Sequence, residues 1–278
     1  MTWHIVADSS CDLFETPIPT EKADFFTIPF SIQIGPREYR DHEDISVEAL
    51  LADNEKSKAV ATTACPSPQD WADRFMAEGP VLAFTISSNL SGSYNSACTA
   101  REMILEKDPS KQIAVIDSKA TGPETVLIIK KACELINQGL SFEEIVPRLQ
   151  ETADRTHIIF ALASYHNLIK HGRVNRFVGL IAGHLGFWGI GIGDENGTIA
   201  MRGKVRGQVK MIRFMVEEIK RIGLAGQEIV ISHCQNLEAA LRLKESLLEI
   251  FHQISVRILP TRGLDSFYAE RNGLIVGF

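Results

Sequence analysis

Residues 81–100 read VLAFTISSNLSGSYNSACTA, and this stretch describes one strand, one loop and the start of one helix. Val81 to Ile86 is an unbroken apolar run of strand length, and Ser93 to Lys107 follows with apolar residues on a helical spacing. The intervening loop is rich in serine, which is typical of a turn that leads into a helix. We therefore expect a buried strand whose carboxyl end is followed by hydroxyl groups.

The same order of elements continues on both sides of this unit. Strands are predicted at Trp3–Ala7, Phe25–Ile34 and Gln112–Ile116, and helices at Val47–Leu51, Pro68–Met76 and Pro123–Asn137. Ser141 and Glu144 form a capping box that begins another helix. Strands that alternate with helices predict a three-layer α/β/α domain, with a mostly parallel sheet covered on both faces.

The pattern changes after Arg155. Asp194-Glu195-Asn196-Gly197 separates two extended segments, which is a strong hairpin signal, and Leu168–Leu185 reads as a broken helix. A hairpin among helices predicts an α/β domain with a mixed sheet. We expect two domains, an N-terminal one over residues 1–160 and a C-terminal one over residues 161–278.

Composition excludes several classes of protein. The 278 residues carry a net charge of -6 and a pI of about 5.8, which argues against a nucleic-acid-binding protein. The five cysteines form no CxxC pair, and the N-terminus lacks a signal peptide. The apolar run Phe177–Gly193 is shorter than the ~20 residues that a spanning helix needs. We expect a cytoplasmic protein with reduced thiols that is not an integral membrane protein.

Signals for a cofactor or a metal ion are missing from the sequence. Gly189-Ile190-Gly191-Ile192-Gly193 resembles a dinucleotide loop, but a hairpin rather than a helix follows it. No Walker A motif is present, and the eight histidines lack the spacing of metal ligands. We expect neither a cofactor nor a metal.

Polar pairs end three of the predicted strands: Asp8-Ser9, Ser87-Ser88 and Asp117-Ser118. Ligands of open parallel sheets bind at these carboxyl ends, although serine and aspartate are also common turn residues. The loop that contains Ser91 and Gly92 could hold a carboxylate or a phosphate with its hydroxyl and N–H groups. The alternative for Ser91 is helix capping.

Two further segments could join such an anion site. The loop Thr62–Pro68 is small and rich in hydroxyl groups, with the start of a helix as its alternative interpretation. Arg173 lies just past the predicted domain boundary, and a guanidinium suits a carboxylate or a phosphate. An exposed surface arginine is the alternative. The residues alone thus predict an anion-binding cleft between two α/β domains.

Five short motifs, in order along nearly the whole chain, resemble the DegV family of bacterial lipid-binding proteins. They are Ile5–Leu13, the Thr63 loop with Pro66-Ser67-Pro68, Ile86–Tyr94, Val115–Ser118 and Leu168–Val174. The resemblance implies a two-domain fold with a long-chain fatty acid, such as palmitate or oleate, buried between the domains. It also implies that Thr63 and Ser91, with the amide of Gly92, hold the carboxylate. Arg173 would lie near the head group.

Tyr268 departs from the family pattern, because it stands where many members carry a histidine that faces the head group. A phenol can donate a hydrogen bond to a carboxylate, so Tyr268 is also a candidate ligand-binding residue. Unlike a histidine, it does not become a cation near neutral pH. Some members present the acid to a separate kinase that makes acyl phosphate, so a fatty acid kinase subunit is an implied partner. The departure at Tyr268 leaves participation in that reaction open.

The favoured hypothesis is a non-enzymatic carrier of a long-chain fatty acid, with a role in lipid transport or fatty acid metabolism. The alternative is an enzyme in which Ser91 or Tyr268 acts on an acyl or phosphoryl group of a small substrate. No general base is evident beside Ser91 in the sequence. A third hypothesis is a regulatory module whose ligand state a partner reads.

Overall fold

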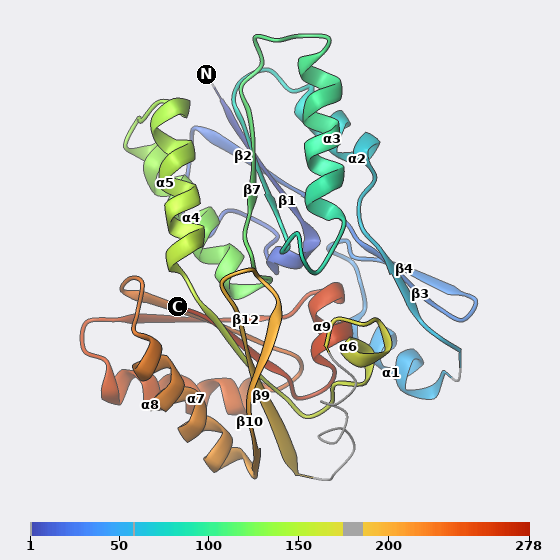
Figure 1. The fold of residues 1–278 in the computed structure, drawn as a ribbon, viewed down its shortest axis with the longest axis vertical. Coiled ribbons are helices and arrows are strands. Elements are labelled where there is room, and N and C mark those ends of the chain that lie inside the picture. The colour runs from blue at the N-terminus through green and yellow to red at the C-terminus, as the bar shows by residue number, and fades with distance from the viewer. Residues whose placement is uncertain (1, 58, 175–185) are drawn as a thin grey trace.

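The computed structural model describes residues 2–57, 59–174 and 186–278, and Figure 1 shows its fold. Four parallel strands form the first sheet, in the order β2-β1-β6-β7. Their bounds are β1 Trp3–Asp8, β2 Ala23–Ile28, β6 Val81–Thr85 and β7 Ile113–Asp117.

Helices cover both faces of this sheet (Figure 1). They are α2 Pro68–Phe75 and α3 Ser93–Leu105 on one face, and α4 Pro123–Asn137 and α5 Phe142–Arg155 on the other. Alternation along β1 explains the two layers, because Ile5 packs in the cluster with α4 and α5 whereas Val6 packs with α2 and α3. The predicted three-layer α/β/α arrangement is confirmed.

The second sheet is mixed and has the order β10-β9-β8-β13-β11-β12. Its strands are β8 Ile158–Leu162, β9 Phe187–Gly193, β10 Ile199–Arg206, β11 Glu228–His233, β12 Ser255–Pro260 and β13 Leu274–Gly277. β9 and β10 form the predicted hairpin, and β11 and β12 are parallel. The helices α7 Gln208–Ile222 and α8 Leu237–Ile250 cover one face. The predicted C-terminal mixed sheet is therefore confirmed.

A third sheet was not expected from the sequence. It is antiparallel, with β3 Ser31–Ile34 between β4 Arg37–Arg40 and β5 Thr62–Ala64. The extended segment expected over residues 25–34 is divided between two strands, because the chain leaves β2 after Ile28 and starts β3 at Ser31. At this break the amide of Phe30 donates to Ser9 Oγ instead of to a neighbouring strand.

Four shorter helical segments complete the described elements. They are η1 Ser9–Cys11, α1 Val47–Lys56, α6 His166–Lys170 and α9 Gly263–Ala269. α6 is the described part of the predicted broken helix, and residues 175–185 lie outside the described part of the chain. The helix α9 was missed by the sequence analysis, and α1 is five residues longer than predicted, since it ends at Lys56 and not at Leu51.

The predicted domain limit falls within β8. This strand hydrogen-bonds to β9 and β13 of the mixed sheet, so a boundary after residue 160 divides it. The division into residues 1–160 and 161–278 stays a prediction. In the described ranges, every helix is too short or too polar to cross a membrane.

Candidate functional site

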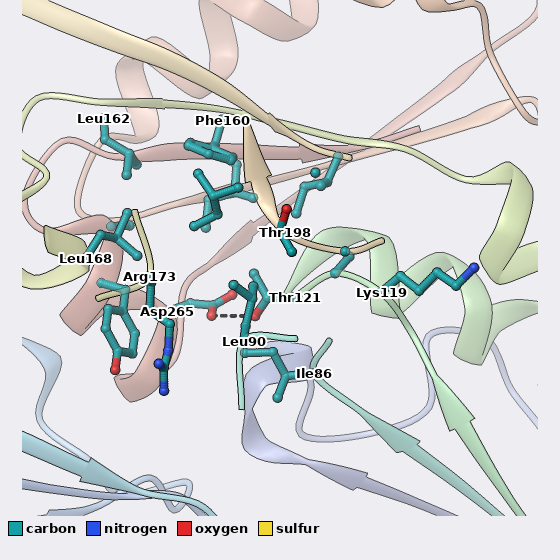
Figure 2. A pocket seen from close by; sticks show the side chains of 18 residues that line it. Ile86, Leu90, Lys119, Thr121, Phe160, Leu162, Leu168, Arg173, Thr198 and Asp265 are labelled. Carbon is teal, nitrogen blue, oxygen red and sulfur yellow. Dashed lines mark hydrogen bonds between the residues drawn. The ribbon is translucent and has the colours of Figure 1, made fainter. Parts of the chain in front are cut away.

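An apolar cavity of about 710 Å³, its open mouth included, lies between the two large sheets. Its walls come from β8, β10, β13, α6 and α9, and from the loops that follow β6, β7 and β9 (Figure 2). Most of the lining side chains are apolar: Ile86, Leu90, Ile158, Phe160, Leu162, Leu168, Ile199 and Ile275.

The alternation of β8 explains why one wall is apolar. Ile158, Phe160 and Leu162 face the cavity, whereas Ile159 and Ala161 pack against α7 and α8. A glycine sets the position of the largest of these side chains, since Gly191 on β9 pairs with Phe160. A Cβ atom on Gly191 would lie only 2.5 Å from Cζ of Phe160, so the phenyl ring rests directly on the glycine.

A chain of hydrogen bonds closes one end of the cavity. The hydroxyl of Tyr268, which lines the cavity, lies 2.9 Å from Thr63 Oγ1 and 2.9 Å from Nδ1 of His171. The other ring nitrogen of His171, Nε2, lies 2.9 Å from the carbonyl oxygen of Ala61. Burial lowers the pKa of His171 and raises the pKa of Tyr268, so both side chains are neutral near pH 7.

Arg173 brings a positive charge to the same end. It lines the cavity although it is exposed, and its Nη1 donates to the carbonyl oxygen of His171 at 3.3 Å. Figure 2 shows its side chain among those that line the cavity. The predicted residues Arg173 and Tyr268 thus both reach the cavity, and Thr63 is joined to it through the Tyr268 hydroxyl.

Ser91 and Gly92 lie just outside this wall. Leu90, the preceding residue, lines the cavity, and a Cβ atom on Gly92 would lie 3.6 Å from Sγ of Cys65 in the Thr63 loop. Ser91 Oγ accepts a hydrogen bond from the amide of Ser93 at 3.3 Å, in the turn that leads into α3, and the N-cap residue of that helix is Gly92. The structure brings the two predicted loops together, and leaves their contact with a ligand as a prediction.

The polar pairs at the strand ends bond within the protein. Asp8 Oδ2 accepts from the amide of Ile86 at 3.0 Å and from Ser93 Oγ at 2.6 Å, and Oδ1 accepts from Ser10 Oγ at 2.5 Å. Ser87 Oγ donates to the carbonyl oxygen of Gly197 at 2.7 Å. These side chains tie the strand ends to neighbouring loops.

Sequence reasoning missed two polar groups of the site. The histidines were discounted because they lack the spacing of metal ligands, and the partner of His171 is a phenol 97 residues away. Asp265 is 3% exposed and lines the cavity, where it accepts a hydrogen bond from Thr121 Oγ1 at 2.7 Å (Figure 2). The glycine and arginine that follow His171 were noted in the sequence, but no local signal marked Asp265.

Asp265 faces a second buried carboxyl, that of Asp12, which is 4% exposed. The Oδ2 atoms of both side chains have no hydrogen-bond partner among the described residues. They converge on Gly122, whose Cβ, if it had one, would lie 2.5 Å from Asp265 Oδ2 and 2.9 Å from Asp12 Oδ2. Burial raises the pKa of both carboxyls, and the charge of Asp12 raises that of Asp265 further.

Metal ligands do not gather in the structure. Within the described ranges, no three histidine, cysteine, aspartate or glutamate side chains form a group that could hold a metal ion. The polar groups that line the cavity are three hydroxyls, one carboxyl and two cations: Thr121, Thr198, Tyr268, Asp265, Lys119 and Arg173.

Comparisons with known proteins agree with this arrangement. A family model described as "Uncharacterised protein, DegV family" matches residues 2–269. A DegV domain-containing protein of Streptococcus pneumoniae is 36% identical over 278 residues, which is all of this chain and 99% of that protein.

Solved structures are similar over the whole fold. The fatty acid kinase B3 protein of Streptococcus pneumoniae, solved with linoleic acid, has a TM-score of 0.97 at 36% identity, over 100% of this chain and 99% of that chain. A DegV family protein of Eubacterium eligens, solved with heptadecanoic acid, has a TM-score of 0.94 at 32% identity, over 99% of each chain.

Proposed function

The chain belongs to the DegV family, and we propose that it binds the anion of a long-chain fatty acid in the cavity between its two large sheets. The observation that carries the proposal is an apolar cavity whose lining includes the Tyr268 hydroxyl, which is hydrogen-bonded to Thr63, and the Arg173 guanidinium. A ligand with an aliphatic tail and an anionic head group fits such a cavity, because the tail would contact the apolar walls and the head group would contact the polar residues. The acids bound in the two similar structures, linoleic and heptadecanoic, support the choice of ligand.

We propose that Thr63, Ser91, the amide of Gly92 and Tyr268 hold the carboxylate, with Arg173 close by. Support comes from the position of Tyr268 at the cavity wall, its bond to Thr63, and the packing of Leu90 and Cys65 in one cluster with Tyr268. The tail would then run along the β8 wall past Phe160 and Leu162.

The two parts of the ligand contribute different amounts of free energy. Each buried methylene stabilises the complex by about 0.8 kcal/mol, so about 15 methylenes contribute roughly 12 kcal/mol before the costs of binding. A head-group hydrogen bond contributes only about 1 kcal/mol. The tail therefore supplies most of the affinity, and the head group fixes the orientation.

The role that fits this site is that of a carrier. In the described residues, the hydrogen-bond partner of the Ser91 hydroxyl is a backbone amide and not a base, so nothing activates it as a nucleophile. A kinase subunit that receives the acid is the proposed partner, in line with the name of the similar Streptococcus pneumoniae protein. We propose a cytoplasmic location, which suits the unpaired cysteines.

Extraction of the purified protein with organic solvent, followed by mass spectrometry, tests the function. We expect about one fatty acid per chain, and its chain length would identify the ligand. Ile199→Trp should lose most of the acid, because Ile199 lines the cavity and a tryptophan there would occupy the path of the tail.

Leu241→Trp is the matched control. Leu241 is 47% exposed on α8 and lies away from the cavity, so this variant should keep its acid. An empty wild-type extract, together with failure to take up added palmitate or oleate, would contradict the proposal. Equal loading of Ile199→Trp and the wild type would place the acid elsewhere.

A further inference from the structure

The hydrogen-bond chain from Ala61 to Thr63 has a direction that the protonation state of His171 sets. The carbonyl oxygen of Ala61 can only accept, so Nε2 of His171 carries a hydrogen in either state. In the neutral ring Nδ1 is then an acceptor, and the Tyr268 hydroxyl must donate to it. The Tyr268 oxygen can then only accept from the Thr63 hydroxyl, so the hydroxyl proton of Thr63 is not available to a ligand.

A proton on Nδ1 reverses both remaining bonds. The imidazolium donates to the Tyr268 oxygen, Tyr268 donates to Thr63 Oγ1, and the hydroxyl proton of Thr63 becomes free. Thr63 can then donate to an anion at the end of the cavity. When His171 is neutral, the hydrogen-bond chain presents only the lone pairs of Thr63 Oγ1 to such an anion. When His171 is protonated, Thr63 can donate a hydrogen bond to the anion, and the imidazolium supplies a nearby positive charge.

We propose that binding of the carboxylate is coupled to uptake of one proton from solvent by His171, which acts through Tyr268 and Thr63 as a positioning residue. This inference rests on the proposed function, and it adds a regulation of the same site by pH. A carboxylate at the end of the cavity and a proton on His171 each favour the other, so the coupling is reciprocal.

The surroundings of His171 keep its ring neutral until an anion arrives. His171 is half-buried, and the charged groups that act on it are Lys170 and His166 from α6 and Arg173 from the turn that follows. Burial of the ring is the main cause that lowers its pKa, and these groups lower it further, whereas the hydrogen bond to the Ala61 carbonyl acts in the opposite direction. From α9, Tyr268 and the ring of Phe267 contact it, and the Glu270 carboxylate is engaged with the amide of Asn167.

Titration calorimetry of the delipidated protein with oleate tests the coupling. Run at pH 7 in buffers with different enthalpies of ionisation, it counts the protons taken up per acid bound. We expect uptake by the wild type, and an affinity that rises as the pH falls from about 8 towards 6. His171→Gln should take up no proton and bind about fivefold more weakly, with little pH dependence.

Two further variants separate the coupling from simple damage to the fold. Tyr268→Phe keeps the ring that packs on Phe267 and His171 but removes the hydroxyl, so it should also abolish proton uptake. His252→Gln replaces an exposed histidine outside the cavity and should behave as the wild type.

Each outcome bears on a distinct claim. If the wild type binds oleate without proton uptake, or if His171→Gln takes up as many protons as the wild type, the coupling is refuted and the proposed function stands. If the wild type does not bind oleate at all, both are refuted.

Discussion

Polar side chains gather in two neighbouring regions of this molecule. At the carboxyl ends of β1 and β6, Asp8 and Ser87 form hydrogen bonds with backbone groups and serines of adjacent segments. At the end of the cavity, Thr63, His171 and Tyr268 form a chain whose last hydroxyl can turn towards a ligand. Asp8 and Ser87 are buried, whereas Thr63, His171 and Tyr268 are only partly buried. The first region therefore holds the fold, and the second can respond to a ligand.

The largest expected effect is a loss of stability in the first region. Asp8→Ala removes the acceptor of the Ile86 amide and of two serine hydroxyls, all of them buried. We expect the free energy of unfolding to fall by about 3 kcal/mol or more, because buried donors are left without partners.

Urea unfolding measures this loss, and Ser88→Ala is the control. Among the described residues its hydroxyl has no hydrogen-bond partner, so its removal should change stability by less than about 0.5 kcal/mol. Oleate affinity of the folded Asp8→Ala protein should be unchanged. A large loss of oleate affinity at full stability would assign Asp8 to the binding site, and the distinction between the two polar regions would be wrong.

The carboxyl pair of Asp12 and Asp265 lies between the two regions and should make stability depend on pH. Burial raises both folded-state pKa values above those of the unfolded chain, so the folded state holds more protons once the pH exceeds about 4. Stability should therefore fall as the pH rises from about 4 to above neutrality. Asp12→Asn removes one charge and turns an N–H₂ group towards Asp265, which should raise stability at pH 8.5 by about 2 kcal/mol.

Urea unfolding at pH 5 and pH 8.5 checks this sign. Asp194→Asn supplies a control of opposite sign, because hydrogen bonds from Thr198 lower the pKa of Asp194. That variant should lose stability above pH 4, where the wild-type carboxylate is ionised. If Asp12→Asn were less stable than the wild type at pH 8.5, the two carboxyls would not repel each other as we infer.

The preference of the cavity for fatty acids of a given chain length should depend on Gly191, because this glycine sets the position of Phe160. A methyl group at this position would overlap the Phe160 ring and push it into the cavity. For Gly191→Ala we expect oleate to bind about tenfold more weakly while dodecanoate is little affected, since about two buried methylenes account for that factor.

Calorimetry with the two acids measures the difference. Gly226→Ala is the control, because a Cβ atom there would have no neighbour within 4 Å and the backbone has an ordinary conformation. An equal loss of affinity for both acids would mean that the tail does not reach Phe160.

The sequence predicted what depends on local pattern. The alternation of apolar strands such as residues 81–86 with helices predicted the parallel sheet, and the turn at residues 194–197 predicted the hairpin. Each strand, helix start or tight turn leaves its mark on a few adjacent residues. β5 has only three residues and depends on its pairing with β3, so no such mark exists. For the same reason it was interpreted as a loop.

The site was predicted only in part. Motifs pointed to Arg173 and Tyr268, which line the cavity, but not to the bond between Tyr268 and His171, because the fold and not the spacing along the chain brings them together. The phenol cannot replace the charge of a histidine. The structure places a histidine one hydrogen bond away from it, and that proximity was not readable in either segment alone.

The smallest expected effect is at Ser91, where stability and oleate affinity together distinguish a local hydrogen bond from ligand binding. In the structure its hydroxyl accepts from the amide of Ser93, and in the proposed complex it would also donate to the carboxylate. Ser91→Ala should thus weaken oleate binding by about fivefold and lower the free energy of unfolding by about 1 kcal/mol. Ser91→Asn keeps a side-chain oxygen that can accept from the Ser93 amide but changes the donor, so it should regain the stability and not the affinity. If Ser91→Ala lost stability alone, Ser91 would belong with Asp8 among the groups that hold the fold, and the head group would depend on Thr63 and Tyr268.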